Sequence, residues 1–259
     1  MSEIAVSRWP EHVLGAGVIL IALSAVELAV RTGYVNGALI PAPSAVAQRV
    51  AVIVASGELF APLATTLYLL FTAYFAASAL AIAVGLLMGR FAPLYNLLEP
   101  LVEVLRPLPK PALLPPLILF LGLGDAMKLT VIGLGVFFPV LINTVQGVRG
   151  VDPTLTDTGR TFRCGGTALL LRIVLPASMP LILAGMRVAL GLGLILVVIA
   201  EMLAGNGGLG YLIIDMQRSF RVQDMYAWIV ILAVLGYALN ALFLKVEQHA
   251  IHWALAQPD

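Results

Sequence analysis

The sequence has 259 residues, of which 61% are hydrophobic and 11% charged, and its formal net charge is +1. Because a soluble domain carries about 25% charged residues, this composition excludes a water-soluble protein and predicts a chain solvated by lipid. The net charge argues neither for nor against nucleic acid, but no basic run is present to neutralise phosphates, so no nucleic-acid partner is expected. The single cysteine excludes an internal disulfide and a cysteine-based metal cluster.

Six apolar stretches along the chain predict about six membrane-spanning helices. The first is expected to be a retained anchor, because no cleavage-type Ala-x-Ala motif follows it. No linker or internal repeat divides the sequence, so we expect an all-α integral membrane protein with a single transmembrane domain over residues 1–259 and a core at 60–248. The predicted spans are Val13–Val30, Pro62–Met88, Leu97–Leu121, Lys128–Val148, Met179–Ala204 and Tyr226–Phe243.

Two segments depart from a plain spanning helix. After the first span, the partly apolar stretch that opens at Pro41 and Pro43 predicts a short interfacial helix. The third span is rich in proline and cannot be a regular helix, because each proline removes a backbone donor. Such backbone is tolerated at membrane depth only when it is buried in protein or lines a wet cavity. Candidates for the wall of a translocation pathway are therefore Pro107, Pro109, Phe137 and Phe138.

The distribution of Lys and Arg predicts the orientation of the chain in the membrane. With the N-terminus inside, ten of the 15 basic residues fall on the cytoplasmic side and five on the outer side. Six spans then return the C-terminus to the cytoplasm. The longest polar connection, Val148–Pro176, also falls on the cytoplasmic side.

This connection predicts a short helix–turn–helix at residues 152–176. Asp152 followed by Pro153 is typical of a helix start, and Gly165-Gly166 is expected to end that first helix. Thr167 is expected to cap a second helix, Ala168–Val174, which Pro176 would stop. From the residues alone, a docking element for another protein and an ordinary amphipathic surface loop are both open.

The stretch DTGRTFRCGGTALLLRIVLP resembles the cytoplasmic signature of ABC importer permeases, E-A-A-R-x-x-G followed by I-x-L-P. Further stretches in the same order resemble the nitrate/sulfonate/taurine branch of that family: LIPAPSAV, RPLPKPALLPPLILFLGLG, GVFFPVLINTVQGVRGVDP and IAEMLAGNGGLGYLI. The sequence departs from the signature in four places. Asp157 replaces its glutamate, Thr158 and Gly159 replace its alanines, and Arg163 stands where its glycine is expected.

The resemblance implies a non-catalytic permease subunit that forms the pathway for a small anion such as a sulfonate, taurine, nitrate or a related organic acid. It implies a bacterial inner-membrane location and an assembly of two permease copies, two ABC ATPase subunits and an extracytoplasmic solute-binding protein. The sequence has no G-x-x-x-x-G-K-[ST] loop, so ATP and Mg are expected on the ATPase and no cofactor or metal on this chain. The residues implied in ATPase coupling are Asp157, Thr158, Gly159, Arg160, Phe162, Gly165, Leu175 and Pro176.

Glu201 lies near the outer end of the fifth span. A carboxylate at that depth in the membrane is energetically unfavourable unless it faces a cavity or a polar partner. A pathway or gate role and a structural hydrogen-bonding role are both open for this carboxylate. The following run from Gly205 to Gly210 matches G-x-G-x-x-G, but it follows a spanning helix and not a strand, so it predicts an outer turn and not a dinucleotide site. Earlier in the same span, Arg187 is expected to pair with Glu99 or Glu103.

Gly185, Ala189 and Gly193 recur every four residues on one face of the fifth span. Small residues at this spacing let two helices approach closely. They are compatible with a seam between two permease copies or with packing inside one subunit. Two other functional classes also stay open: a secondary transporter that needs no ATPase, and an intramembrane enzyme, which no Ser–His or Asp–Asp pair at a plausible membrane depth supports.

Overall fold

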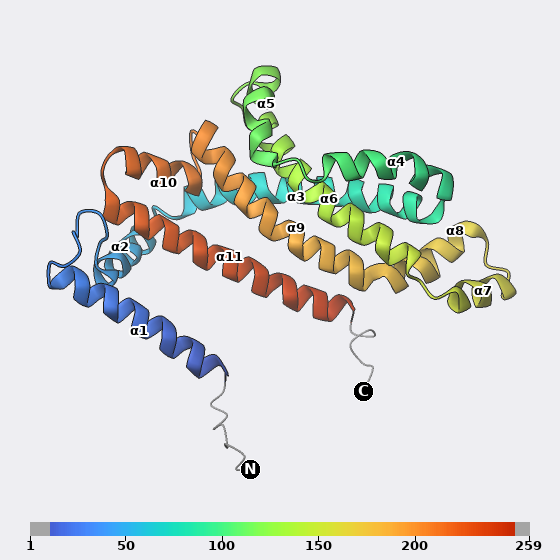
Figure 1. Ribbon diagram of the computed structural model, residues 1–259, viewed down its shortest axis with the longest axis horizontal. Coiled ribbons are helices and arrows are strands. Elements are labelled where there is room, and N and C mark those ends of the chain that lie inside the picture. The colour runs from blue at the N-terminus through green and yellow to red at the C-terminus, as the bar shows by residue number, and fades with distance from the viewer. Residues whose placement is uncertain (1–10, 252–259) are drawn as a thin grey trace, which may run out of the picture. The chain divides into compact units, whose positions relative to one another are not determined.

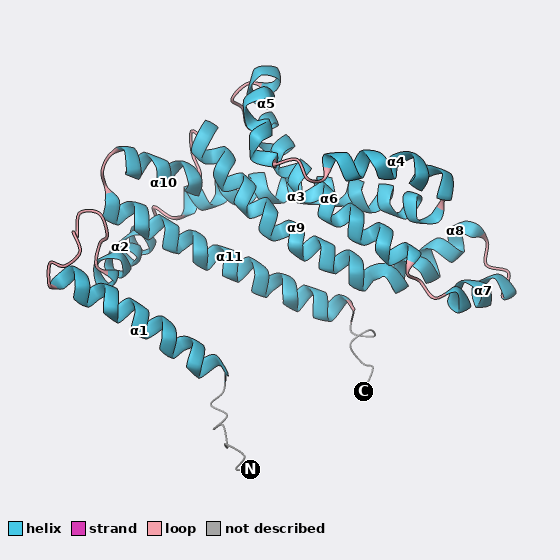
Figure 2. Cartoon of the chain, in the orientation of Figure 1, coloured by secondary structure: helices cyan, strands magenta, loops and turns pink. Residues whose placement is uncertain are grey.

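The computed structural model describes residues 11–251, and every regular element in that range is a helix (Figures 1 and 2). Two short elements differ from α-helices: η1 is a 3₁₀ turn and η2 is a π turn. The elements are α1 (Glu11–Arg31), α2 (Pro43–Ser56), α3 (Phe60–Arg90), α4 (Ala92–Leu105), η1 (Lys110–Leu113), α5 (Leu114–Leu121), α6 (Asp125–Arg149), α7 (Pro153–Thr161), α8 (Gly166–Leu169), η2 (Leu170–Val174), α9 (Leu175–Ala204), α10 (Leu209–Arg218) and α11 (Val222–Ala250).

The expected all-α membrane protein is confirmed. Within the described residues, four helical segments are long and apolar enough to cross a membrane: α3, α6, the continuous run Gly166–Ala204, and α11. The third predicted span is a bent pair, because α4 and the segment Lys110–Leu121 meet at 88°. Counting that pair as one span gives five. The first predicted span lies in the 21-residue helix α1, but the side chains at the start of α1 are not described. The expectation that α1 also crosses the membrane, which would bring the number of spans to six, stays a prediction.

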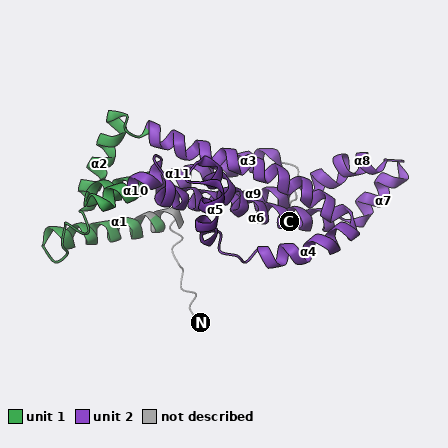
Figure 3. Ribbon diagram, turned by 90° about the horizontal axis from the view of Figure 1, so that it is seen from above, with its two compact units in different colours: residues 1–59, 213–231 green, residues 60–212, 232–259 purple. Residues whose placement is uncertain are grey.

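The chain forms two compact units (Figure 3): residues 1–59 with 213–231, and residues 60–212 with 232–259. The second unit begins where the sequence predicts the start of the core. That the whole chain works as one permease domain stays a prediction.

The first unit is held together by carboxylates that each receive several donors. Glu27 of α1 accepts hydrogen bonds from the backbone N–H of Ser44 at 3.0 Å and from its hydroxyl at 2.7 Å, at the start of α2. Asp224 of α11 pairs with Arg49 of α2 and with Arg221, the latter at 2.7 Å. The predicted short helix after Pro43 is therefore present as α2, and its first residue after the proline is tied to α1.

In the second unit, α3, α6 and α9 lie side by side and enclose the hydrophobic core (Figure 1). The small residues of α9 face this core. A Cβ added at Gly185 would lie 2.6 Å from Cβ of Asn143 and 2.9 Å from the carbonyl oxygen of Pro139, both on α6. A Cβ added at Gly193 would lie 3.0 Å from Leu70 on α3. These contacts are packing within one subunit, which is one of the two roles that the sequence left open for this stripe of small residues.

We expect Gly185→Ala to destabilise the protein, because the added methyl group meets a backbone oxygen that cannot move away without shifting α6. Overpacking of this kind costs about 1–3 kcal/mol, which should lower the midpoint of thermal unfolding of the purified protein in detergent. Gly191→Ala is the matched control on the same helix, since nothing lies within 4 Å of its added Cβ. Equal midpoints for the two variants would contradict the close contact.

Candidate functional site

Helix α7 begins as the sequence predicts. Asp152 is its N-cap, and the Asp152 carboxylate accepts a hydrogen bond from the backbone N–H of Thr154 at 2.8 Å, with Pro153 in the first helical position. The same N–H stabilises the charged carboxylate and holds the pKa of Asp152 below its usual value. The start of the predicted helix–turn–helix is therefore fixed by a local cap.

The end of α7 differs from the prediction. The helix stops at Thr161 and not at Gly165-Gly166. Arg163 adopts a left-handed conformation with φ 56°, the N–H of Arg163 bonds the carbonyl of Arg160 at 2.9 Å, and the N–H of Cys164 bonds the carbonyl of Gly159 at 3.0 Å. This hydrogen-bond pair is the Schellman helix ending, in which glycine normally takes the left-handed position. Arg163 stands where the family signature has glycine, so the turn keeps its place although the residue type differs.

The second helix also differs from the prediction. Gly165, with φ −63°, precedes α8, which begins at Gly166, so Thr167 is not the cap. Pro176 does not stop the helix, because α8 continues through η2 into α9. Proline lacks a donor and crowds the carbonyl of the preceding turn. In η2 the N–H of Leu175 bonds the carbonyl of Leu170, five residues back, and this wider turn accommodates the proline that follows.

Gly159, one of the residues implied in ATPase coupling, lies on the inward face of α7. Gly159 is buried, and a Cβ added there would collide with Ile173 and lie 2.7 Å from Leu169. The closest approach at this glycine is thus inside the chain, between α7 and the segment α8–η2. Thr158 is exposed, and its hydroxyl bonds the carbonyl of Thr154 at 2.7 Å.

The outward face of α7 carries apolar and charged side chains. Phe162 is 79% exposed and Leu155 49% exposed. Asp157 and Arg160 form an exposed ion pair at 3.0 Å. Of the remaining coupling residues, Gly165 is exposed, while Leu175 and Pro176 are half-buried at the base of α9. Nothing within the described chain covers Phe162, so this face is open to a partner.

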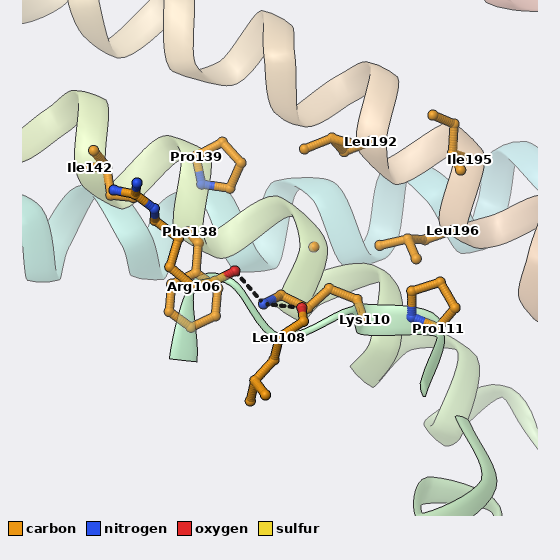
Figure 4. A pocket seen from close by; sticks show the side chains of 11 residues that line it. Arg106, Leu108, Lys110, Pro111, Phe138, Pro139, Ile142, Leu192, Ile195 and Leu196 are labelled. Atoms are coloured by element: carbon orange, nitrogen blue, oxygen red, sulfur yellow. Dashed lines mark hydrogen bonds between the residues drawn. The ribbon is translucent and has the colours of Figure 1, made fainter. Parts of the chain in front are cut away.

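A second candidate site lies at the break between α4 and α5. The ammonium group of Lys110 donates to the carbonyls of Leu105, Arg106 and Leu108 at 2.9, 3.0 and 3.0 Å, two of which are drawn in Figure 4. It also lies 4.5 Å from the ring centroid of Phe138. A single cation therefore satisfies three carbonyls at the end of α4, where the prolines that follow provide no N–H.

An open cavity of about 380 Å³ adjoins this break (Figure 4). Its wall comes from the break, from α6 and from α9, and none of the lining residues, all of which the structure describes, is acidic. The lining residues are Arg106, Leu108, Lys110, Pro111, Gly135, Phe138, Pro139, Ile142, Leu192, Ile195 and Leu196.

Only one of the four predicted wall residues lines this cavity. Phe138 does so, whereas Phe137 packs against the hydrophobic core. Pro107 and Pro109 lie in the break between α4 and α5, but they do not line the cavity. Their neighbours Arg106, Leu108 and Lys110 do. The sequence analysis missed Arg106 and Lys110. Their signal was available, since two basic residues inside a predicted span are costly unless they face a cavity or a polar partner.

Glu201 is fully buried and has several hydrogen-bond partners. The hydroxyl of Thr66 on α3 donates to its carboxylate at 2.8 Å, and the backbone N–H of Gly210 donates at 2.9 Å. The same Thr66 hydroxyl accepts from the N–H of Leu209 at 2.9 Å. Of the two roles open for Glu201, these contacts favour the structural one, and Glu201 does not line the cavity at the break.

The glycine-rich turn after α9 packs directly on this carboxylate. Gly208 has φ 96°, and a Cβ there would collide with the carboxylate of Glu201. The spacing of the glycines thus serves contact with a buried acid, which agrees with the prediction of a turn and not a dinucleotide site.

The expected pairing of Arg187 is wrong. Arg187 lies 3.4 Å from the carboxylate of Glu247 on α11, not beside Glu99 or Glu103. No pattern in the sequence distinguishes among these acids, because the choice depends on where α11 packs.

Comparison with known proteins identifies the family. The model described as "Binding-protein-dependent transport system inner membrane component" matches residues 81–252. A Bacillus subtilis permease protein assigned to aliphatic sulfonates transport is 31% identical over 221 residues, which cover 85% of this chain and 80% of that protein. The Escherichia coli taurine transport system permease protein is 26% identical over 254 residues, covering 95% and 92% of the two chains. The nitrate import permease protein of Leptolyngbya laminosa is 30% identical over 184 residues, covering 71% and 66%.

A solved structure has the same fold. An inward-facing MetNI methionine ABC transporter matches with a TM-score of 0.62 and 19% identity, covering 71% of this chain and 92% of that chain. The chain belongs to the binding-protein-dependent transport system inner membrane component family, and it is a permease subunit of an ABC importer.

Proposed function

We propose that this permease forms the pathway for a small anion, such as a sulfonate, taurine, nitrate or a related organic acid, and that the pathway passes the cavity at the break. An extracytoplasmic binding protein delivers the solute, and a separate ATPase supplies the energy. The assembly contains two permease copies and two ATPase subunits, with both ends of this chain in the cytoplasm. Membership of the family favours this reading over a secondary transporter.

The charge of the cavity supports an anionic solute. Its lining includes two cationic side chains, Arg106 and Lys110, and no acidic one. Arg106 pairs with Glu103 at 3.2 Å, but Glu103 lies outside the lining. The Lys110 ammonium is surrounded by carbonyl dipoles, which reduce its field without cancelling its charge. Relatives named for sulfonates, taurine and nitrate transport point to the same class of solute.

The outward face of α7 supports docking of the ATPase. Phe162 and Leu155 expose apolar surface beside the ion pair of Asp157 with Arg160. An exposed aromatic next to charged groups is typical of a residue that dominates a protein interface. Since Gly159 faces inward, the contact with the ATPase is made by Phe162 and Leu155, and Gly159 sets the distance between α7 and η2. Gly159→Leu would distort the element itself and is therefore no clean test of docking.

Phe162→Ala should weaken binding of the ATPase about tenfold or more, because an interface aromatic contributes about 2 kcal/mol when removed. The measurement is the affinity of the purified permease for the purified ATPase. Phe60→Ala is the matched control, since Phe60 is 68% exposed and stands at the other end of α3 from Arg90.

Cys164 gives an independent readout of the same contact. It is the single cysteine of the chain and follows Phe162 by two residues. Its reaction with a maleimide should slow when the ATPase is bound. Normal ATPase affinity for Phe162→Ala together with unchanged labelling would show that α7 is not the docking element.

Arg106→Gln should reduce uptake of a sulfonate about tenfold, because it removes one of two cations from a cavity in which charges are poorly screened. Arg106→Lys should retain most of the rate. Arg31→Gln is the matched control, since Arg31 is also exposed and paired with an acid on its own helix, at 2.6 Å. Uptake that is unaffected by Arg106→Gln, with the ATPase still bound, would place the pathway elsewhere.

The topology is tested with reporter fusions. The bias of basic residues predicts that fusions after Leu121 and after Asn206 report the outer side, and that a fusion after Gly150 reports the cytoplasm. A cytoplasmic signal at Asn206 would contradict the predicted orientation.

A further inference from the structure

A second cavity lies between the ends of two spans and the docking helix. Its volume is about 300 Å³, and it is lined by residues of α3, α6, α7, α8 and η2. Three of its lining residues are arginines that come from three different helices: Arg90 ends α3, Arg149 ends α6, and Arg160 lies on α7. The other lining residues are Gly89, Val148, Thr156, Leu169 and Val174.

No acidic residue of the cavity lining neutralises these arginines. None of the lining residues, all of which the structure describes, is acidic. Arg160 pairs with Asp157 at 3.0 Å, but Arg90 and Arg149 form no ion pair or hydrogen bond through their side chains with any residue of the described range. The helix dipoles of α3 and α6 favour a cation at these ends, yet they do not explain a third arginine brought in by α7.

An aromatic ring holds one of these guanidinium groups, that of Arg149, and a second ring lies at the outer limit of a cation–π contact with Arg90. The guanidinium carbon of Arg149 lies 3.9 Å from the ring centroid of Tyr95, and that of Arg90 lies 5.9 Å from the ring centroid of Phe91. Stacking on a ring restricts a guanidinium group and leaves its N–H edges available for hydrogen bonds. Paired N–H groups match the oxygens of a phosphate or sulfate in a bidentate manner.

We propose that this cavity binds a tetrahedral oxyanion, namely a phosphate group, which links the ends of α3 and α6 to the docking helix α7. The ligand bonds Arg90 and Arg149 on the side of the spans and Arg160 on the side of α7. It therefore holds the docking helix against the spans. The site is separate from the solute cavity and does not depend on which solute is carried.

Two sources can supply such a group. The arginines end two spans on the side that the charge bias predicts to be cytoplasmic, which is the depth of lipid phosphates. The phosphate of an anionic lipid and free inorganic phosphate share the same recognition chemistry. The experiment must therefore offer both.

The test uses the permease–ATPase complex in phosphatidylcholine nanodiscs. One arm adds phosphatidylglycerol to the bilayer, and the other adds sodium phosphate against sodium chloride of equal ionic strength. The readout is the concentration dependence of the thermal unfolding midpoint, which rises when a ligand binds the folded state. No transport is measured, so the outcome is distinguishable from failure of the proposed function.

The double variant Arg90→Gln with Arg149→Gln should bind the effective probe about tenfold more weakly than the wild type. The matched control is Arg163→Gln with Arg172→Gln, which removes the same charge from two exposed arginines of the same region that do not line the cavity. The control should behave as wild type. If the glutamine pair does not fold, the pair Arg90→Lys with Arg149→Lys keeps the charge and loses bidentate geometry, and should still weaken binding.

A response to phosphatidylglycerol alone assigns the site to a lipid, and a response to free phosphate assigns it to a soluble anion. Equal weakening in the control pair would mean general attraction of basic residues to anions, and the site would be wrong. The proposal would also be overturned if the Arg90 and Arg149 variants bound both probes normally but lost the ATPase, since the arginines would then contact carboxylates of the partner protein.

Discussion

Backbone groups inside a membrane must be satisfied by the protein, because lipid offers no hydrogen bonds. Most of this chain meets that constraint with long helices. Where the helices are interrupted, other groups take over. At the break after α4 the Lys110 ammonium donates hydrogen bonds to three carbonyls, and after α9 the Glu201 carboxylate accepts one from the N–H of Gly210. The two interruptions thus use charges of opposite sign for opposite backbone groups.

The helix that begins in the docking element also forms the wall of the solute cavity. The run Gly166–Ala204 is continuous. Its first part contacts Gly159 of α7 through Leu169 and Ile173, its middle contributes Leu192 and Leu196 to the cavity, and its end carries Glu201. A displacement of α7 by a partner would therefore act on the same continuous helical run that lines the cavity. This continuity gives a physical route between the two candidate sites.

Local signals in the sequence predicted the elements whose causes are local. The start of α7 follows from Asp152 and Pro153, and the spans follow from apolar length. The end of α7 was missed because an arginine holds the left-handed position in which glycine is expected. The second helix was wrongly expected to stop at Pro176. The π turn that accommodates this proline has no recognisable residue pattern, so the sequence could not predict it.

The roles of the charged residues in the predicted spans depended on distant parts of the chain. Glu201 is satisfied by Thr66 and Gly210, which lie on other elements, and Arg187 meets Glu247 of the last helix. No spacing within one helix could select these partners. Arg106 and Lys110 were visible as basic residues within a predicted span, but only the bend between α4 and α5 brings them to a common cavity with Phe138.

The π turn at Leu170–Val174 has a geometric consequence for the register of the long helix. A hydrogen bond in a π turn spans five residues, one more than the four that a hydrogen bond spans in an α-helix. If that extra residue were taken up into regular α geometry, everything N-terminal to it would rotate by about 100° and shift by about 1.5 Å along the axis. The face that α8 presents to α7 would then change while the face that α9 presents to the core stayed fixed.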